Sequence, residues 1–384
     1  MFKKSLAAVA VLGAFAASSF AADVTFYGKV DMGLSYQNAE VTDAQGKKDT
    51  TEALTLDSGV GLASRIGLKA TEQLGNGDKV AFKLEGDFST DDGELAKGKL
   101  WQREASLSYT SDWGKLYAGR YGSFSAAAGD TDIVMDRVES FDGGHKGVSM
   151  MGFSRMDNAL TYFTPKFAGF QAAAMYSFKN DNQSVTGGDE DKGIVGNHEG
   201  HSDADHYAGI ALSYDLGALK TAISYEQLIR HTHDYVDEQG TIKNQPLNDA
   251  KIVTFGGNYD FDMFKLYAGA QYFEGMDKVK DMKFEGLGAD GVEGYALHVG
   301  SKFEALAGHF DTGIYYIDAT GNAQAGLQDR DGEYFGINAR YIYKLSNRTE
   351  IRSSVAYDHQ EVETNAKDWE KDRYLACVSL THNF

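Results

Sequence analysis

Proline and cysteine are nearly absent from this chain of 384 residues, which contains 2 prolines and 1 cysteine. Proline cannot donate a hydrogen bond to a neighbouring strand, so its scarcity favours a protein made largely of paired strands. A single cysteine, Cys377, excludes an internal disulfide, and it occupies an ordinary packing position in a strand pattern. After the N-terminal segment there is no run of eighteen apolar residues. This absence excludes a membrane protein built of helices.

Positive charge is also scarce, with 37 basic against 56 acidic residues and a formal net charge of −19. A nucleic-acid partner is therefore not expected, because such a partner requires a basic face. No cofactor-binding motif occurs together with the secondary structure that it requires. Residues 286–291 fit the G-x-G-x-x-G pattern but lie in a predicted loop with no helix after it.

The first 22 residues have the features of a cleaved signal peptide. Lys3 and Lys4 precede an apolar core at 6–15 that is too short to span a bilayer, and Ser19 and Ala21 provide small residues for cleavage. We therefore expect the mature protein to be one domain, residues 23–384.

Glycine and aromatic residues are abundant, with 44 Gly, 22 Tyr and 22 Phe. From Val24 to Tyr36 every second residue is apolar or glycine, and the residues between them are mostly polar, such as Lys29. Alternation of this kind indicates a strand with one apolar and one polar face. The pattern recurs and predicts sixteen strands, at 24–36, 60–70, 79–88, 100–110, 115–121, 153–164, 168–179, 206–216, 217–230, 250–260, 263–274, 292–303, 309–318, 333–344, 348–359 and 371–384.

The predicted connections alternate between short and long. Short turns such as 74–77 and 345–347 are separated by long acidic connections such as 180–205 and 231–249. This alternation is typical of a transmembrane β-barrel with short periplasmic turns and long external loops. Because an unpaired strand edge is costly in lipid, the first and last strands are expected to pair. The sequence therefore predicts an all-β, antiparallel, sixteen-stranded barrel in the outer membrane.

The polar faces of such a barrel line its lumen. Alternation places Lys29, Arg65 and Lys69 inward, and Arg103 is expected inward with a local irregularity. A connection of about thirty residues, from Gly122 to Gly152, is unusually long. Its acids include Asp130, Asp132, Asp136 and Glu139. We expect this third external loop to fold into the lumen opposite the basic wall, and a plain surface loop is the alternative.

Several short segments resemble the Gram-negative general porin family over nearly the whole mature length. They are VTFYGK at 24–29, SRIGLK at 64–69, EQLGNG at 72–77, GKLYAGR at 114–120, LTYFTPKFAGF at 160–170, YKLSNRT at 343–349 and THNF at 381–384. Each segment alone is weak evidence for the family, but their occurrence in this order on a sixteen-strand frame is strong evidence.

The resemblance implies a homotrimer in outer-membrane lipid that lets small hydrophilic solutes diffuse through a water-filled channel. It implies no enzymatic activity and no cofactor. The third loop would form the constriction, and the basic wall would consist of Lys29, Arg65, Arg103 and Arg155. Phe384 would be the assembly signal read by the barrel-insertion machinery.

One departure from the family concerns the tip of the third loop. The family often has Pro-Glu-Phe-Gly-Gly-Asp, whereas this chain has SAAAGD at 125–130. The glutamate is missing, so Asp130 and Asp132, followed by Asp136, become the expected constriction acids.

Three alternatives remain open from the sequence. A substrate-specific channel for sugars or oligopeptides would need an aromatic track along the lumen, and Tyr27 is the clearest inward aromatic residue. An outer-membrane hydrolase would need a serine beside a histidine on the wall, and no serine is evident beside His382. His198, His201 and His206 lie near acids in the fourth external loop, but their spacing matches no tetrahedral metal site.

Overall fold

The computed structural model describes residues 24–95, 98–126, 128–141, 148–180, 199, 204–230, 233–236, 242–245, 248–365 and 367–384. The signal peptide predicted at residues 1–22 lies outside this range. No helix in the described part of the chain is long and apolar enough to cross a membrane.

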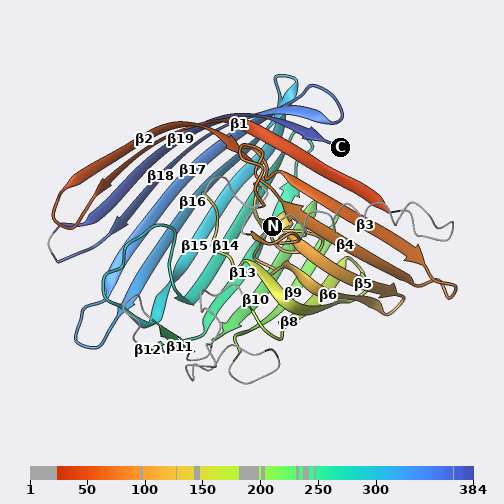
Figure 1. Cartoon of the computed structure of the whole chain (residues 1–384), viewed down its shortest axis with the longest axis horizontal. Coiled ribbons are helices and arrows are strands. Elements are labelled where there is room, and N and C mark those ends of the chain that lie inside the picture. The colour runs from red at the N-terminus through yellow and green to blue at the C-terminus, as the bar shows by residue number, and fades with distance from the viewer. Residues whose placement is uncertain are drawn as a thin grey trace, which may run out of the picture.

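One antiparallel sheet of seventeen strands forms the body of the molecule (Figure 1). Its strands are β1 (Thr25–Thr42), β2 (Lys48–Ser58), β3 (Arg65–Gln73), β4 (Lys79–Asp87), β5 (Glu104–Ser111), β6 (Gly114–Gly122), β7 (Arg155–Phe163), β8 (Phe170–Ser177), β9 (His206–Leu216), β10 (Leu219–Ile229), β13 (Ala250–Asp260), β14 (Phe264–Met276), β15 (Leu287–Ala305), β16 (Gly308–Ala323), β17 (Arg330–Lys344), β18 (Thr349–Val362) and β19 (Trp369–Asn383). A separate hairpin joins β11 (His233–Val236) and β12 (Ile242–Gln245).

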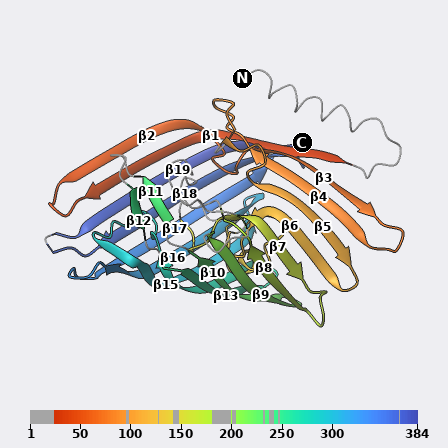
Figure 2. The same ribbon diagram turned by 60° about the horizontal axis from the view of Figure 1, so that its bottom comes forward.

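The barrel is closed, because β1 pairs with β19 from Lys29 opposite Asn383 to Thr42 opposite Glu370. The other edge of β1 pairs with two strands in turn. Its first residues pair with β3, and the stretch from Met32 onward pairs with β2. The β1–β2 and β3–β4 hairpins point to opposite sides of the molecule (Figure 2). Strands β2 and β3 therefore share one position in the wall, and seventeen strands fill the sixteen positions of the predicted barrel.

The break between β2 and β3 corrects one predicted strand. The sequence pattern placed a strand at 60–70, but residues 59–64 leave the sheet and β3 begins at Arg65. Gly59 has a φ of +68°, a conformation that favours glycine and ends β2. Strand β2 was not predicted, because most of its side chains are exposed and many are polar. The short strands β11 and β12 were not predicted either.

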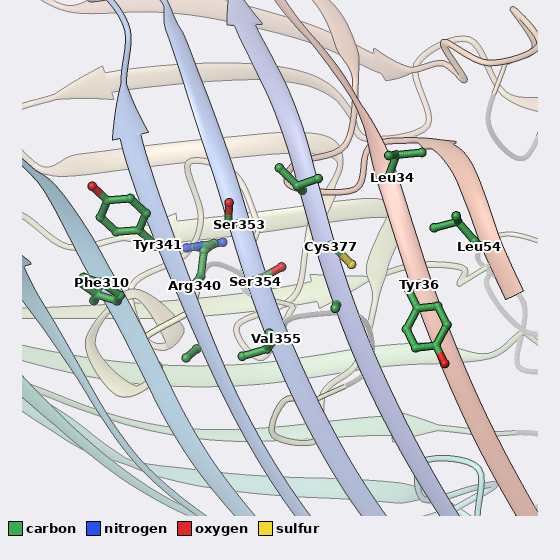
Figure 3. Close-up of a pocket in the computed structure, with 13 residues that line it drawn as sticks. Leu34, Tyr36, Leu54, Phe310, Arg340, Tyr341, Ser353, Ser354, Val355 and Cys377 are labelled. Carbon is green, nitrogen blue, oxygen red and sulfur yellow. The ribbon is translucent and has the colours of Figure 1, made fainter. Parts of the chain in front are cut away.

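The outward face of the barrel is apolar. Leu34, Leu107, Ile210 and Phe255 are 47%, 58%, 61% and 59% exposed, respectively. An apolar groove of about 500 Å³ runs across the successive strands β16, β17, β18, β19, β1 and β2, with Leu34, Leu54 and Val355 among its lining residues (Figure 3). Large apolar side chains exposed on alternate strand positions are what a lipid-facing wall requires.

Tyrosines within the long strands, several residues from the external ends, mark the edge of this apolar band. The hydroxyls of Tyr36, Tyr295, Tyr316 and Tyr357 each donate to a carboxylate of a neighbouring strand. Aromatic rings with polar tips are suited to the membrane–water interface. The strands continue beyond these tyrosines, so this side of the barrel extends past the expected hydrocarbon region.

The third loop lies inside the barrel, as the sequence predicted. Residues after β6 include the helical turn α2 (Met135–Val138) and pack on the inner face of β13 and β14. A Cβ atom at Gly269 of β14 would lie 2.3 Å from Cγ1 of Val138. Glycine at this position lets the loop approach the wall closely.

Candidate pore constriction

The inserted loop crosses the inner wall from β10 to β17 and is bonded to most strands on the way. Asn258 of β13 donates to the carbonyl of Arg137 at 2.9 Å. Ser140 donates its hydroxyl to the carbonyl of Thr312 on β16 at 2.7 Å. On the returning limb, Met151 and Gln271 of β14 exchange two hydrogen bonds of 2.8 and 3.0 Å. These bonds fix the loop against one half of the wall and leave the other half to line the pore.

Glu226 of β10 holds both ends of the loop. Its Oε2 accepts hydrogen bonds from the backbone N–H and the hydroxyl of Ser125, at 3.2 and 3.0 Å, and from Tyr207 at 2.7 Å. The hydroxyl of Ser125 in turn accepts the N–H of Phe153 at 2.9 Å, which belongs to the returning limb. A fully buried carboxylate therefore ties the two limbs to the wall.

The opposite wall carries the predicted basic residues. Arg103 donates from Nε to Glu85 at 2.7 Å, and Arg65 lies 3.7 Å from the same carboxylate. Arg103 lies just before β5, so it is outside the inward–outward alternation of the β5 side chains. The backbone N–H of Arg103 donates to the carbonyl of Glu85. Arg155 begins β7 and donates from Nε to the carbonyl of Arg103 at 2.7 Å. Three guanidinium groups are thus linked in series along the wall between β3 and β7, because Arg65 and Arg103 share Glu85 and Arg155 bonds to the backbone of Arg103.

Two predicted basic residues have no ion pair within the part of the chain that the structure describes. They are Lys29 on β1 and Arg155 on β7, neither of which has a carboxylate oxygen within 4.0 Å there. Sequence reasoning missed Arg120, which forms an ion pair with Asp157 on the same wall. Its inward position was available from the predicted strand 115–121.

The same wall contains acids that sequence reasoning also missed. Glu85 and Asp87 of β4 pair with Arg103, and Glu104 of β5 pairs with Lys83 at 3.0 Å. Alternation along the predicted strand 79–88 would have placed Glu85 and Asp87 inward. Which arginine each acid contacts depends on strand register, which the sequence alone does not give.

The structure places the three loop acids in different environments. Asp130 is exposed and lies 3.0 Å from Lys83. Asp136 forms an ion pair of 2.7 Å with Arg137, which also contacts Asp215. Asp132 accepts backbone N–H groups at the start of α2, including that of Met135 at 2.8 Å. Each of these carboxylates therefore has a partner within the loop or on the wall.

Asp132 is held at the beginning of α2 rather than in open water. Burial and the neighbouring carboxylate of Asp136 raise the pKa of Asp132 to about 6, against the opposing effect of the backbone N–H groups. The carboxylate acts locally as a helix cap.

A second inward segment, residues 59–64, was not expected from the sequence. Asp31 is fully buried and accepts hydrogen bonds from the N–H of Gly61 at 2.9 Å, from Ser379 at 2.9 Å and from Thr381. Ser64 bonds to both backbone groups of Asp31 at 3.0 Å. We name residues 59–64 the strand-break segment. It packs on the inner face of β1 and β19, directly before Arg65.

The C-terminal residue completes the barrel seam. Phe384 and Gly28 exchange two backbone hydrogen bonds of 3.1 Å, and the Phe384 ring lies 5.6 Å from that of Phe26. A Cβ atom at Gly28 would lie 2.4 Å from the Phe384 ring. The terminal aromatic side chain is therefore packed across the closing strand pair.

The described residues contain a serine–histidine contact, between the hydroxyl of Ser140 and Nε2 of His298 at 3.3 Å. The other ring nitrogen of His298 lies 3.2 Å from the carbonyl of Ile314 rather than against a carboxylate, so the pair is not a catalytic triad. No group of three His, Cys, Asp or Glu side chains in these ranges is arranged to hold a metal ion. His198 and His201 lie outside the described residues, and His206 begins β9. The G-x-G-x-x-G match at 286–291 runs into β15 rather than a helix, so it does not form a dinucleotide site.

A closed barrel with an inserted loop and charged inner walls is the arrangement of a diffusion channel, and comparison with known proteins identifies it. The family model for Gram-negative porins matches residues 7–363. The chain belongs to the Gram-negative porin family. This porin is 31% identical to an outer membrane porin protein of Bordetella pertussis, over 92% of this chain and 94% of the relative. It is 28% identical to outer membrane porin protein 32 of Delftia acidovorans, over 89% and 94% of the two chains.

The solved structures support the same fold. The structure of the anion-selective porin from Comamonas acidovorans superposes with a TM-score of 0.61 and 21% sequence identity. The match includes 95% of this chain and 100% of the Comamonas chain. This porin is an outer-membrane protein that forms a water-filled channel for passive diffusion of small hydrophilic solutes and ions.

Proposed function

We propose that the narrowest part of this channel favours anions. The observation that carries the proposal is the difference between the two sides of the constriction. Lys29 and Arg155 lack a carboxylate within 4.0 Å in the described ranges, whereas Asp130 and Asp136 are each paired with a cation. Asp132 has backbone N–H partners but no cation partner in these ranges, so two uncompensated cations of the basic wall stand against one uncompensated acid of the loop.

Uncompensated cations at a constriction raise the local concentration of anions and repel cations. The partial pairing of Arg65 and Arg103 with Glu85 reduces their contribution. Lys29 and Arg155 consequently carry most of the preference. The related fold of a channel described as anion-selective is consistent with this assignment.

The test is the double substitution Lys29→Gln and Arg155→Gln in planar bilayers under a KCl gradient. Each charge about 4 Å from a passing ion contributes about 1 kcal/mol in water, or roughly fivefold in the permeability ratio. The reversal potential should therefore move towards cation preference. The control is Lys47→Gln with Lys367→Gln, which removes the same charge from exposed loops. Equal shifts in the two double variants would contradict the proposal.

The homotrimer is also a proposal for this chain. Strands β3 to β6 contain 8 or 9 residues each, and β2 pairs only with β1 among the described strands. Leu54 and Leu56 of β2 are 69% and 57% exposed. An uncovered strand edge is costly in lipid, so a neighbouring subunit on this side would stabilise it. Native mass measurement in mild detergent tests this, and a stable monomer would contradict it.

Diffusion involves no chemical step, so we assign no residue a catalytic role. A channel of this kind is not an enzyme. Lipase and esterase assays of the purified protein provide the direct check, and turnover above the background of an empty-vector preparation would contradict this view.

A further inference from the structure

A cavity of about 480 Å³ lies on the external side of the returning limb of the inserted loop. Its walls come from four parts of the chain: the returning limb and the start of β7, the residue Asn180 after β8, the external end of β10, and the end of β14 with the segment after it. The lining residues are Met150, Met151, Gly152, Phe153, Ser154, Met156, Asn180, Leu228, Arg230, Met276, Asp277, Lys278 and Lys280. We name it the vestibule pocket.

One part of the vestibule pocket is apolar. Four methionines, at positions 150, 151, 156 and 276, line it with Phe153 and Leu228. All six side chains belong to the buried apolar cluster inside the barrel. Methionine side chains adapt to ligands of different shape and make favourable contacts with aromatic rings.

The other part of the vestibule pocket is cationic. Arg230 is neutralised by Asp277 at 2.8 Å and bonds to the carbonyls of Asn248 and Gly275. Lys280 donates to the carbonyl and the hydroxyl of Ser149 at 2.5 and 3.1 Å and to the carbonyl of Met150 at 3.3 Å, which are neutral acceptors. Neither Lys278 nor Lys280 has a carboxylate within 4.0 Å in the described part of the chain. Two positive charges are therefore left without an ion-pair partner.

We propose that the vestibule pocket binds small amphiphilic carboxylates, which have one carboxylate and a compact apolar body such as a ring. The proposal rests on the anion preference proposed above and adds a substrate class to it. The lysines match the carboxylate, and the methionines and Phe153 match the apolar body. The volume lies within the range of about 300–1,000 Å³ for small-molecule sites.

The position of the vestibule pocket connects it to the constriction. Ser154 lines the pocket, and the next residue is Arg155 of the basic wall. The pocket therefore lies beside the backbone that carries the unpaired guanidinium of Arg155. Binding before the constriction would raise the local solute concentration at the channel entrance.

Benzoate is a suitable probe, with acetate and benzyl alcohol as the matched compounds that lack the ring or the charge. Each is added on the external side of channels in a planar bilayer, and the current block is measured against concentration. We expect saturable block by benzoate only. Equal effects of benzoate and acetate, or of benzoate and benzyl alcohol, would overturn the proposal.

Two variants, Lys278→Gln and Met151→Gln, test the cationic part and the apolar part of the vestibule pocket, respectively. Lys278→Gln should weaken benzoate block about fivefold, as expected for one charge in a wet site. Lys283→Gln is the matched control, because it removes the same charge from an exposed position in the same segment outside the pocket. Equal weakening in both variants would show a general field effect and overturn the assignment.

Met151→Gln replaces an apolar lining side chain by a polar one of similar length and should weaken benzoate block. The backbone bonds of Met151 to Gln271 do not involve the substituted atoms. Unblocked conductance equal to that of the natural protein shows that the channel is intact. If the natural channel prefers anions in KCl but is not blocked by benzoate, this inference alone is overturned. If the natural channel shows no anion preference, the proposed function is overturned.

Discussion

Ser125, in the first turn of the inserted loop, donates its hydroxyl to Glu226 of the barrel wall at 3.0 Å. The same hydroxyl accepts the N–H of Phe153 from the far end of the loop. One serine thus connects the outgoing limb, the returning limb and the wall. The outgoing limb begins and the returning limb ends at this connection, so it fastens both limbs to the wall.

Substitution of Glu226 by Ala should loosen the inserted loop. It removes the acceptor for Ser125 and Tyr207. Each buried donor left unsatisfied costs about 1–3 kcal/mol. Single-channel recordings should show greater open-channel noise and additional conductance levels. Glu226→Gln keeps one acceptor oxygen and should have a smaller effect, and an Ala variant as quiet as the natural channel would disprove the anchoring role.

Substitution of Asp31 by Ala should release the strand-break segment and destabilise the barrel. It leaves the N–H of Gly61 and the hydroxyls of Ser379 and Thr381 without their acceptor. At about 1–3 kcal/mol for each buried donor, the unfolding temperature in detergent should fall clearly. Asp57→Ala, on the adjacent β2, removes a partly exposed carboxylate and is the control. Equal unfolding temperatures of the two variants would refute this role.

Benzoate binding at the vestibule pocket should weaken as the pH rises from 7 to 9. Burial lowers the pKa of Lys280 to about 8, although Glu139, Asp358 and Asp281 oppose this effect and Arg373 adds to it. Lys280 is therefore mostly charged at pH 7 and mostly neutral at pH 9, whereas benzoate stays ionised. Lys280→Arg keeps its charge over this range and should remove most of the pH dependence. An identical pH profile in both proteins would exclude Lys280 as the titrating group.

Substitution of Phe384 by Ala should reduce the amount of folded protein in the outer membrane. The aromatic ring packs on Phe26 and over Gly28 at the seam where the barrel closes. We propose that the barrel-insertion machinery also reads this residue. The folded fraction is measured from the heat-dependent shift in gel mobility. Phe167→Ala, an 81% exposed aromatic residue in a short turn, is the control and should fold normally.

The strand pattern was predictable because the membrane imposes it locally. Wherever a strand crosses lipid, alternate side chains must be apolar, as in β1 and β19, and this requirement is visible in the sequence. Strand β2 was missed because its polar, exposed side chains do not follow that rule. The external extensions of β15 to β18 were underestimated for the same reason.

The basic side of the constriction was partly predictable. Lys29 and Arg65 follow from alternation, but the pairing of Arg103 with Glu85 depends on residues eighteen positions apart in sequence. The vestibule pocket was not predictable, because Lys278, Leu228 and Met151 meet only when the loop folds back into the barrel.

The sequence by itself determined the membrane-spanning strands, the closed barrel and the inward position of several charges, because each follows from side chains that alternate between lipid and water. Only the tertiary structure decided which of these charges are neutralised, where β2 gives way to β3 and how the inserted loop is fastened by Glu226. These features arise from contacts between distant segments, and strand register and loop path set them.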